Sequence, residues 1–538
     1  MTEQASHTRG EPEVELLTET IGERFDRSVA AFPGREALVD AVTGRRWTYA
    51  ELAADVDRVA RGLRARGVRK GDRVGIWATN CPEWVLVQYA TARLGAVLVT
   101  VNPAYRTHEL AHALARAGVS LLIALPDDDP ASSVPAGGDR RTTAAEAGAG
   151  CPALREVLWI GGPAWHRLDG PEQDFPALHP DEPITVQYTS GTTGSPKGAT
   201  LSHRSILNNG HCVGALLGYT EQDRICVPVP FYHCFGMVLG NLAALSHGAC
   251  VVIPARTFDP AATLRAVATE RATSLYGVPT MFIAELGLPD FAAYDLSSLR
   301  TGLTGATPCP VELMKRVRSD LGMAGVAIAY GMTETSPVST LTRGDDDLDH
   351  RTGTVGRVLP HLEVKVADPA SGRTLPRGAV GELCTRGYAV MLGYWEEPER
   401  TAEAVDRDGW MHTGDLALMR PDGYLEVVGR IKDMIIRGGE NVYPREVEEY
   451  LHTHPGVADA QVVGVPHERY GEEVFAFVVL RDPAGGPAPE ELTAYCRDGL
   501  ARYKAPRHVR VVDAFPMTVS GKVRKNELRE LAARELGR

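Results

Sequence analysis

Short apolar runs alternate with amphipathic stretches over the first third of the chain. Residues 73–78, 96–101 and 120–125 are apolar or β-branched at most positions, which is typical of strands. Residues 83–94 and 107–117, which lie between them, repeat apolar side chains at helical spacing. This alternation predicts mostly parallel α/β layers.

Threonines and turn residues mark the expected boundaries of these elements. Thr48 precedes a helical stretch over 49–66, and Thr107 is expected to cap the helix over 107–117, because a threonine hydroxyl accepts a hydrogen bond from the first helical turn. Residues 126–150 are rich in proline, glycine and aspartate. This composition predicts a mobile, low-complexity segment on the surface.

The pattern changes twice further along the chain. A second α/β block covers 184–328, and from 356 to 430 short strands alternate with glycine turns, which predicts a small β-rich subdomain. A separable unit follows, with expected helices at 445–452 and 491–501, strands at 458–465 and 474–480, and a linker at 481–489. The predicted fold class is α/β. It has a large N-terminal lobe of two α/β subdomains plus the β-rich subdomain, and a small C-terminal α+β lobe.

Composition excludes several broad classes of protein. The chain has 538 residues, of which 44% are hydrophobic and 23% charged, so it is neither disordered nor fibrous. Its 57 lysines and arginines stand against 69 acidic residues, a net charge of −12, which argues against nucleic acid as a partner. Only eight of the 57 basic residues are lysines, so a lysine within a motif is more informative than usual.

Cysteine spacing and the N-terminus indicate the compartment. The nine cysteines are scattered without a C-x-x-C pair, which predicts reduced, mostly buried thiols and neither a disulfide framework nor a zinc site. Residues 1–15 are polar and acidic, unlike a signal peptide. The best membrane-span candidate, 85–101, is interrupted by Gln88 and Arg93. We therefore expect a cytoplasmic protein without a transmembrane segment.

Ten residues after the apolar strand 184–188 have the composition of an anion-binding loop. They read Thr189-Ser190-Gly191-Thr192-Thr193-Gly194-Ser195-Pro196-Lys197-Gly198. Glycines let backbone N–H groups approach phosphate oxygens, hydroxyls donate, and Lys197 supplies positive charge. The loop is not a Walker A motif, because Pro196 stands where that motif needs glycine. Composition alone fits a flexible Ser/Thr/Gly surface turn equally well.

The longer string YTSGTTGSPKGATLSH is much more specific. It resembles the AMP-binding signature of the adenylate-forming superfamily, which contains acyl-CoA synthetases, peptide-synthetase adenylation domains and firefly luciferase. Further family motifs follow in the same order: 330–334 (YGMTE), 412–415 (HTGD), 429–433 (GRIKD), 438–444 (GGENVYP) and 520–522 (SGK). The resemblance covers nearly the whole chain.

Three stretches favour one branch of this superfamily. Residues 102–110 (NPAYRTHEL), 232–241 (YHCFGMVLGN) and 276–286 (YGVPTMFIAEL) look most like bacterial medium- and long-chain fatty acyl-CoA synthetases. The resemblance implies an acid–thiol ligase that uses ATP, Mg²⁺ and coenzyme A. One segment departs from the family pattern, 303–310 (LTGATPCP), where relatives tend to carry A-G-S/A-P-C-P. Because the family lines its acyl pocket there, the identity of the acid stays open.

The resemblance also implies roles for the nucleotide-binding residues. Glu334 would bind Mg²⁺, Thr333 would contact the α-phosphate, and Tyr330 beside Gly331 would stack on adenine. Asp415 suits the two ribose hydroxyls because a carboxylate has two acceptor oxygens, and Arg430 would add a second ribose contact. The β- and γ-phosphates would be held by Thr189, Ser190, Gly191, Thr192, Thr193, Gly194 and Lys197.

The acyl and coenzyme A sites are implied in the same way. His233 corresponds to the acyl-pocket gate, although a lone histidine among apolar neighbours is more often a core residue. Further pocket candidates, for which core packing is nearly as well supported, are Met237, Val278, Gly305, Ala306, Thr307 and Met332. Gly438 and Gly439 would let backbone lie close along pantetheine. Lys522 corresponds to the catalytic lysine of the C-terminal lobe.

Domain division and partners follow from the same resemblance. We expect an N-terminal AMP- and acyl-binding domain over 1–430 and a mobile C-terminal domain over 431–538, with a hinge near Lys432. The expected partners are a small carboxylic acid and coenzyme A, and the family favours a homodimer.

Four other functions share part of this pattern. A fatty acyl-AMP ligase that feeds a carrier protein usually has an insertion beyond the first large lobe, whereas 430–438 is short here. An enzyme specialised for thioesterification of a supplied adenylate could keep the whole fold. No feature indicates luciferase-type oxygenation. A degenerate nucleotide-binding regulator would have damaged motifs, yet Lys197 and Lys522 are both present.

Overall fold

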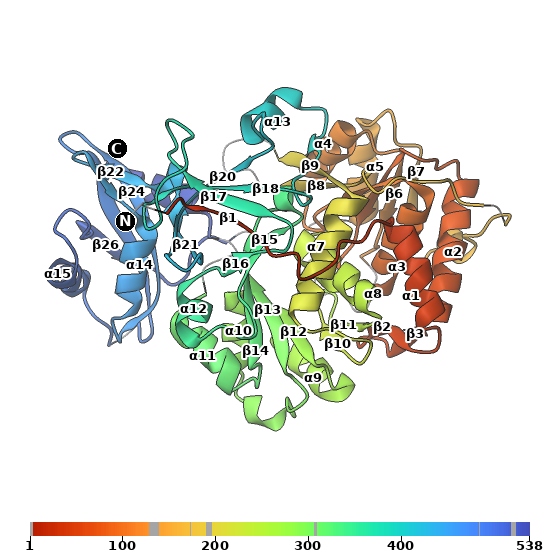
Figure 1. Ribbon diagram of the computed structural model, residues 1–538, viewed down its shortest axis with the longest axis horizontal. Helices are drawn as coiled ribbons and strands as arrows, with labels where there is room; N and C mark the ends of the chain where they lie inside the picture. Colours follow the sequence, from red (N-terminus) through yellow and green to blue (C-terminus); the bar gives the residue numbers. More distant parts are fainter. Residues whose placement is uncertain are drawn as a thin grey trace. The chain divides into compact units, whose positions relative to one another are not determined.

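The computed structural model describes residues 4–127, 139–172, 174–189, 196–305, 309–483, 485–517 and 523–537. The chain forms two compact units (Figure 1). The larger unit comprises Thr8–Val364 and Thr385–Met411. The smaller unit comprises Met1–His7, Lys365–Cys384 and His412–Arg538.

One sheet of the larger unit has nine strands among the described residues. Its central strands, from β14 to β2, run parallel, and β16, β15 and β3 join antiparallel at the edges. The strand order is β16 (Arg357–Val358), β15 (Val338–Leu341), β14 (Gly325–Gly331), β13 (Thr301–Gly305), β12 (Ser274–Gly277), β10 (Arg224–Cys226), β11 (Cys250–Ile253), β2 (Glu36–Asp40) and β3 (Arg45–Thr48).

A second sheet of the larger unit has seven described strands. Its order is β19 (Gly393–Tyr394), β9 (Lys197–Ser202), β8 (Pro183–Thr189), β5 (Val97–Thr100), β4 (Arg73–Trp77), β6 (Leu121–Ala124) and β7 (Glu156–Trp159). Strands β5 and β6 are buried at every position, which explains their continuous apolar sequence. The parallel α/β layers predicted from the sequence are therefore confirmed.

Helices α3 and α7 contact both sheets and form part of the layer between them. Helix α3 contacts β4 and β5 of one sheet and β2 of the other, while α7 contacts β9 and β15. Helix α3 is therefore apolar on nearly all sides. The helices of the larger unit are α1 (Ile21–Ala31), α2 (Tyr49–Ala65), α3 (Pro82–Leu94), α4 (Thr107–Ala117), α5 (Arg140–Ala149), α6 (Pro163–His166), α7 (His203–Leu216), α8 (Ala243–His247), α9 (Pro260–Glu270), α10 (Pro279–Leu286), α11 (Val311–Ser319), α12 (Leu348–Gly353) and α13 (Pro398–Ala404), with the short helices η1 (Phe235–Leu242), η2 (Phe291–Ala293) and η3 (Thr333–Thr335).

Two predicted boundaries are corrected by the structure. Thr48 caps α2 as expected, but the N-cap of α4 is Arg106, whose backbone N–H bonds to Glu109, so Thr107 is already the first helical residue. Residues 140–149 belong to the segment that was predicted to be mobile, but they form α5. Asp139 caps this helix and Ala144 and Ala147 bury one side of it, so its alanine content outweighs the turn residues that precede it.

The smaller unit contains two sheets and three α-helices among its described residues. The first sheet has the order β1 (His7–Arg9), β17 (Glu363–Ala367), β18 (Gly381–Arg386), β20 (Met411–Met419) and β21 (Leu425–Arg430). The second has the order β23 (Glu440–Val442), β22 (Ile435–Arg437), β25 (Gly471–Leu480) and β24 (Val457–His467), with β26 (His508–Val511) beside β25. The helices are α14 (Pro444–His452), α15 (Pro489–Gly499) and α16 (Lys525–Glu535), with the 3₁₀ turn η4 (Ile431–Asp433).

The compact units group the chain by its contacts, and the division into domains over 1–430 and 431–538 stays a prediction. The β-rich segments 365–384 and 412–430 cluster with residues 431–538 and not with the α/β sheets. A hinge near Lys432 stays a prediction.

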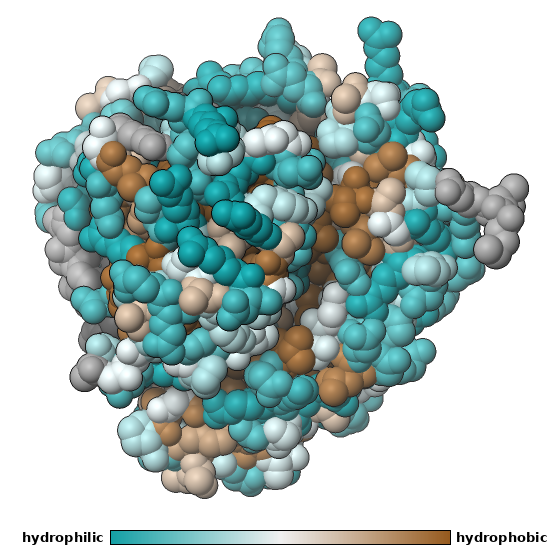
Figure 2. Space-filling model, turned by 90° about the vertical axis from the view of Figure 1, so that its left-hand side faces the viewer, coloured by the Kyte–Doolittle hydropathy of each residue, from teal (hydrophilic) through white to brown (hydrophobic). Residues whose placement is uncertain are grey.

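The surface and the cysteines agree with a globular protein. The face in Figure 2 is mainly hydrophilic, with hydrophobic side chains in smaller groups. All nine cysteines are free and buried, which confirms the prediction of buried thiols. Each described helix is too short or too polar to cross a bilayer.

Buried histidines predict a loss of stability in mild acid. His203 is fully buried, and its Nδ1 accepts a hydrogen bond of 3.2 Å from the backbone N–H of Ile21. Burial lowers the pKa of His203, and also that of His211, to about 4. Between pH 6.5 and about 4, these histidines are protonated in the unfolded chain and neutral in the folded chain. The free energy of unfolding therefore decreases as the pH falls from 6.5 towards 4.

We expect His203→Asn, which keeps an acceptor oxygen but does not titrate, to flatten part of this decline in urea unfolding at pH 7.5, 6 and 5. His179→Asn, at an exposed histidine, is the matched control. An unchanged pH dependence in His203→Asn would contradict the assignment.

Candidate active site

The hairpin of β8 and β9 brackets the predicted phosphate loop. Thr189 ends β8 and Lys197 begins β9, and the two are paired across the hairpin. The Thr189 hydroxyl donates to the Lys197 carbonyl at 3.4 Å. The loop residues Ser190, Gly191, Thr192, Thr193 and Gly194 lie outside the described residues, so their predicted phosphate contacts stay predictions.

Tyr394 brings Lys197 and Glu334 together from distant parts of the sequence. Strand β19 pairs with β9, which places the Tyr394 ring 4.8 Å from the Lys197 Nζ. The Tyr394 hydroxyl donates to Oε1 of Glu334 at 2.8 Å. Burial, followed by the neighbouring Glu334 carboxylate, raises the pKa of Tyr394, so this hydroxyl stays a donor.

Glu334 itself is firmly held. It lies in η3 directly after β14 and is only 6% exposed. Its backbone carbonyl accepts a hydrogen bond of 2.9 Å from the Met391 N–H. A fixed carboxylate joined through Tyr394 to the lysine that begins β9 fits a hard, oxygen-preferring cation such as Mg²⁺ together with phosphate groups.

Tyr394 is a functional candidate that sequence reasoning missed. It lies in the segment 391–395 (MLGYW), whose residue types do not by themselves indicate phosphate chemistry. The contact arises only because β19 pairs with β9 across almost two hundred residues of sequence. A short apolar strand with glycine before tyrosine was the only available signal.

The carboxyl ends of three parallel strands gather other predicted residues. Val278 follows β12, Gly305 ends β13, and Tyr330 lies at the end of β14. The register pairs Gly277 with Thr304 and Gly305 with Ala329, so these ends meet at one edge of the sheet. Open α/β sheets bind their ligands at this edge.

Two glycines at this edge are required by the backbone around them. A Cβ at Gly305 would lie 2.7 Å from the Ala329 carbonyl oxygen, and one at Gly331 would lie 1.9 Å from that of Pro337. The Pro337 carbonyl occupies the space that a Cβ of Gly331 would take, so close backbone packing explains this glycine without a ligand. Adenine stacking by Tyr330 stays a prediction. Ala306 and Thr307 lie outside the described residues.

His233 and Met237 flank the start of a π-helix, η1. The rings of His233 and Tyr232 are 4.6 Å apart, and Cys234 Sγ is 3.8 Å from the hydroxyl of Thr333. This contact brings the His233 segment beside the predicted α-phosphate ligand. A π-helix is rare and frequently occurs at functional sites.

The two remaining pocket candidates of this region differ in burial. Met237 is 1% exposed, and its sulfur accepts from the Gln187 amide at 3.3 Å, so it packs in the interior. Met332 is half-buried as the N-cap of η3.

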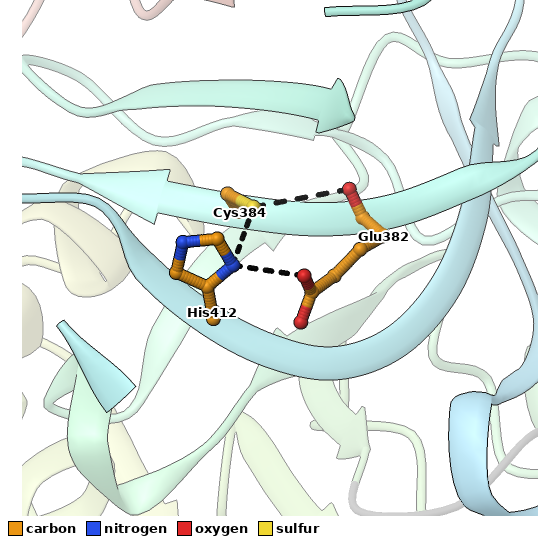
Figure 3. A group of neighbouring side chains, drawn as sticks. All are labelled: Glu382, Cys384 and His412. Atoms are coloured by element: carbon orange, nitrogen blue, oxygen red, sulfur yellow. Dashed lines mark hydrogen bonds and ion pairs between the residues drawn. The ribbon is translucent and has the colours of Figure 1, made fainter. Parts of the chain in front are cut away.

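Asp415 and Arg430 form an ion pair in the smaller unit. They are register partners on β20 and β21, and the Arg430 Nε donates to Oδ1 of Asp415 at 3.0 Å. The pair places a hydrogen-bond acceptor, the carboxylate, beside a donor, the guanidinium, and this combination suits two adjacent hydroxyl groups of a ligand. His412 lies at the start of β20, and its side chain is close to those of Glu382 and Cys384 on the adjacent strand β18 (Figure 3).

The predicted hinge residue has an unusual electrostatic environment. Lys432 lies in η4, directly after Arg430 and Ile431. Burial, and then repulsion from Arg430, lowers the pKa of Lys432 to about 8. This lysine is therefore partly neutral at mildly alkaline pH.

Gly438 and Gly439 form the turn of the β22–β23 hairpin. Their φ angles are +62° and +89°, and the N–H of Gly438 donates to the Tyr470 carbonyl at 2.7 Å. Left-handed backbone conformations explain both glycines without a ligand. Their role along pantetheine stays a prediction, as does that of Lys522, which lies outside the described residues.

Comparison with known proteins gives matches over almost the whole chain. A family model described as AMP-binding enzyme matches residues 25–395, and one described as AMP-binding enzyme C-terminal domain matches 446–522. The protein YngI of Bacillus subtilis (strain 168) is 46% identical over 540 residues, covering 96% of this chain and 97% of that protein.

Two further relatives have informative names. The mitochondrial medium-chain acyl-CoA ligase ACSF2 of Danio rerio is 41% identical, covering 99% of this chain and 91% of that protein. The crystal structure of ATP-bound MatB from Rhodopseudomonas palustris has a TM-score of 0.85 at 32% identity, covering 95% of this chain and 98% of that one.

Proposed function

The chain belongs to the AMP-binding enzymes, as an AMP-forming acid–CoA ligase, and we propose that its acid is a medium- or long-chain fatty acid or a similarly bulky aliphatic acid. The apolar character of Val278 and Met332 supports an aliphatic acid, as does the likeness to a medium-chain ligase. The joining of Lys197 and Glu334 through Tyr394 is the observation that supports the ATP-dependent step, and the likeness to a medium-chain ligase carries the choice of acid.

The reaction has two steps that make different demands. In the first, the acid carboxylate attacks the α-phosphorus of ATP and pyrophosphate leaves. In the second, the coenzyme A thiol attacks the carbonyl of the acyl-adenylate and AMP leaves. Because the first step brings two anions together, it depends on positioned cations and donors more than on acid–base chemistry.

Residues of the larger unit would hold the triphosphate. Lys197 would neutralise β- and γ-phosphate oxygens, helped by the hydroxyls and backbone N–H groups of the preceding loop. Thr333 would contact the α-phosphate. Glu334 would ligate Mg²⁺, which supplies charge compensation for the phosphates when bound. Tyr394 would hold the Glu334 carboxylate in place through its hydroxyl.

The other predicted roles complete the nucleotide and acyl sites. Asp415 would accept hydrogen bonds from the ribose hydroxyls, and its ion pair with Arg430 would keep the carboxylate oriented. Tyr330 would stack on adenine. His233, next to the contact between Cys234 and Thr333, would gate the acyl pocket. We also propose that the protein is a homodimer. The C-terminal domain would rotate about a hinge at Lys432 between adenylate formation and thioester formation.

A panel assay tests the function directly. The purified protein is incubated with ATP, Mg²⁺ and acids of two to eighteen carbons, with and without coenzyme A, and acyl-AMP, AMP and acyl-CoA are followed by mass spectrometry. We expect acyl-CoA and AMP in equal amounts, with the highest rates for acids of medium or long chain. Acyl-CoA formed only from supplied acyl-adenylate would instead indicate an enzyme specialised for thioesterification. Acyl-AMP that coenzyme A does not consume would indicate transfer to a carrier protein.

Gly439→Trp should separate the two steps. We expect adenylate formation within about twofold of wild type and thioester formation reduced about tenfold or more, because the indole would obstruct the pantetheine path. A Cβ at Gly439 meets no atom within 4 Å, so the bulk fits, although its φ of +89° strains any side chain. Gly439→Asn, which tolerates this backbone conformation better, is the matched control and should retain both steps. Equal loss of both steps in Gly439→Trp would contradict this role.

A further inference from the structure

Three consecutive residues before Asp415 are anchored to strand β18. Oε2 of Glu382 accepts from Nδ1 of His412 at 2.8 Å, and Oε1 accepts from the Gly414 N–H at 3.0 Å. The hydroxyl between them, on Thr413, donates to the Leu383 carbonyl at 2.6 Å. A single buried carboxylate therefore holds both ends of the His412–Gly414 turn, as Figure 3 shows for its histidine partner.

The backbone conformation makes this anchoring important for Asp415. Gly414 has a φ of +70°, a left-handed conformation that interrupts the extended backbone of β20 one residue before Asp415. The Asp415 N–H donates to the Thr413 hydroxyl at 3.1 Å, which ties Asp415 to the same turn. On its other side Asp415 is fixed by Arg430. The direction of the Asp415 carboxylate thus depends on the turn that Glu382 holds.

Glu382 is well placed for a permanent structural role. Its side chain is only 11% exposed, so its bonds to His412 and Gly414 compete little with water. Hydrogen bonds to a charged acceptor are stronger than those between neutral groups. Glu382 is not among the residues that the family motifs indicated.

The same group could instead be a metal site, because Cys384 Sγ lies 3.7 Å from the His412 Nδ1. The distances favour hydrogen bonding. Two nitrogen and oxygen ligands on a tetrahedral zinc ion lie about 3.3 Å apart or more, given zinc–ligand bonds of about 2.0–2.2 Å. The observed 2.8 Å between Nδ1 and Oε2 is a normal N–H···O separation.

We propose that Glu382 is a positioning residue for ribose recognition: it holds the His412–Gly414 turn and thereby orients Asp415. This inference rests on the proposed function, in which Asp415 binds the ribose of ATP.

The test compares Glu382→Leu with Glu382→Gln. Leucine removes both hydrogen bonds. Glutamine can keep both, because its oxygen can accept from Gly414 while its amide donates to the other tautomer of His412. We expect Glu382→Leu to raise the KM for ATP about tenfold with kcat within about threefold, and Glu382→Gln to restore most of the loss. The KM for the acid should not change.

Discrimination between ATP and 2′-deoxy-ATP is the decisive readout, because a general structural defect would lower both rates alike. We expect the ratio of the two kcat/KM values to fall several-fold in Glu382→Leu, towards that of Asp415→Ala. If Glu382→Leu does not fold, His412→Ala tests the same turn with the carboxylate kept, and the same fall in the ratio is expected.

The possible outcomes separate the two levels of inference. A wild type that forms no acyl-AMP would overturn the proposed function. A wild type that adenylates normally, with a discrimination ratio unchanged in Glu382→Leu, would overturn the positioning role alone. Stoichiometric zinc in the purified protein, absent from Cys384→Ser, would overturn it in favour of a metal site.

Discussion

Lys522→Ala is expected to reduce acid-dependent pyrophosphate release by about a hundredfold or more, the effect of losing one preorganised charge contact. A flexible ammonium group is a compact point charge with three donors. It can contact the acid carboxylate and an α-phosphate oxygen together, and so offset their repulsion in the adenylation transition state. The same variant should still convert supplied acyl-adenylate and coenzyme A to thioester, because this charge is not needed once the adenylate exists.

The chain offers a matched control three residues away. Lys525 is bonded to Glu448 and to the Val462 carbonyl, so it already has a structural role within the smaller unit. Lys525→Ala should adenylate within about twofold of wild type. Lys522→Ala that adenylates normally would contradict the assignment, as would a wild type that performs only the thioester step. In that second case the departure at 303–310 is the first place to look for the cause.

The second large effect concerns stability. Asp40 is fully buried at the end of β2 and forms a two-pronged ion pair with Arg256, at 2.8 Å and 2.9 Å. Arg256→Met would leave this carboxylate buried without its cationic partner, although the Thr43 hydroxyl and the Val42 N–H would still donate to it. We expect a loss of about 3–5 kcal/mol in the free energy of unfolding, the usual cost of breaking a buried pair from one side.

Urea unfolding, with hydrogen exchange of β2 and β11 as the local readout, measures this loss. The double variant Asp40→Asn/Arg256→Met should recover at least half of it, because no buried charge remains unpaired. Lys315→Met, which breaks an exposed pair with Glu312, should change stability by less than about 0.5 kcal/mol. Equal losses of unfolding free energy in Arg256→Met and Lys315→Met would contradict the prediction that burial makes the Asp40–Arg256 ion pair the more costly one to break.

The fold was largely predictable because its central strands are buried on both faces. Continuous apolar runs such as 97–100 and 121–124 have few other interpretations when helical stretches separate them. Helix α5 was missed because turn residues dominate the composition of 126–150 and obscure the short alanine-rich segment at its end. The composition of the whole segment does not show where the turn residues end and the helix begins. Burial of Ala144 and Ala147, which stabilises the helix, depends on tertiary packing.

The site was predictable only where a motif lies within one segment. Lys197 and Glu334 were found from their own motifs, but Tyr394, which joins them, was not, because strand pairing brings it there. Glu382 was missed for the same reason, since its bonds to His412 and Gly414 run between strands thirty residues apart. Glycines were the least reliable signal, because positive φ angles at Gly438 and Gly439 and close packing at Gly331 explain them without a ligand.

Transfer of labelled oxygen tests the central claim most directly. Octanoic acid labelled with ¹⁸O at both carboxyl oxygens is converted with ATP and coenzyme A, and the masses of the products are measured by mass spectrometry. Attack of the carboxylate on the α-phosphorus predicts one ¹⁸O atom in each AMP and none in pyrophosphate, with acyl-CoA retaining the other oxygen. Unlabelled AMP, or label in inorganic phosphate released beside ADP, would contradict activation through an acyl-adenylate.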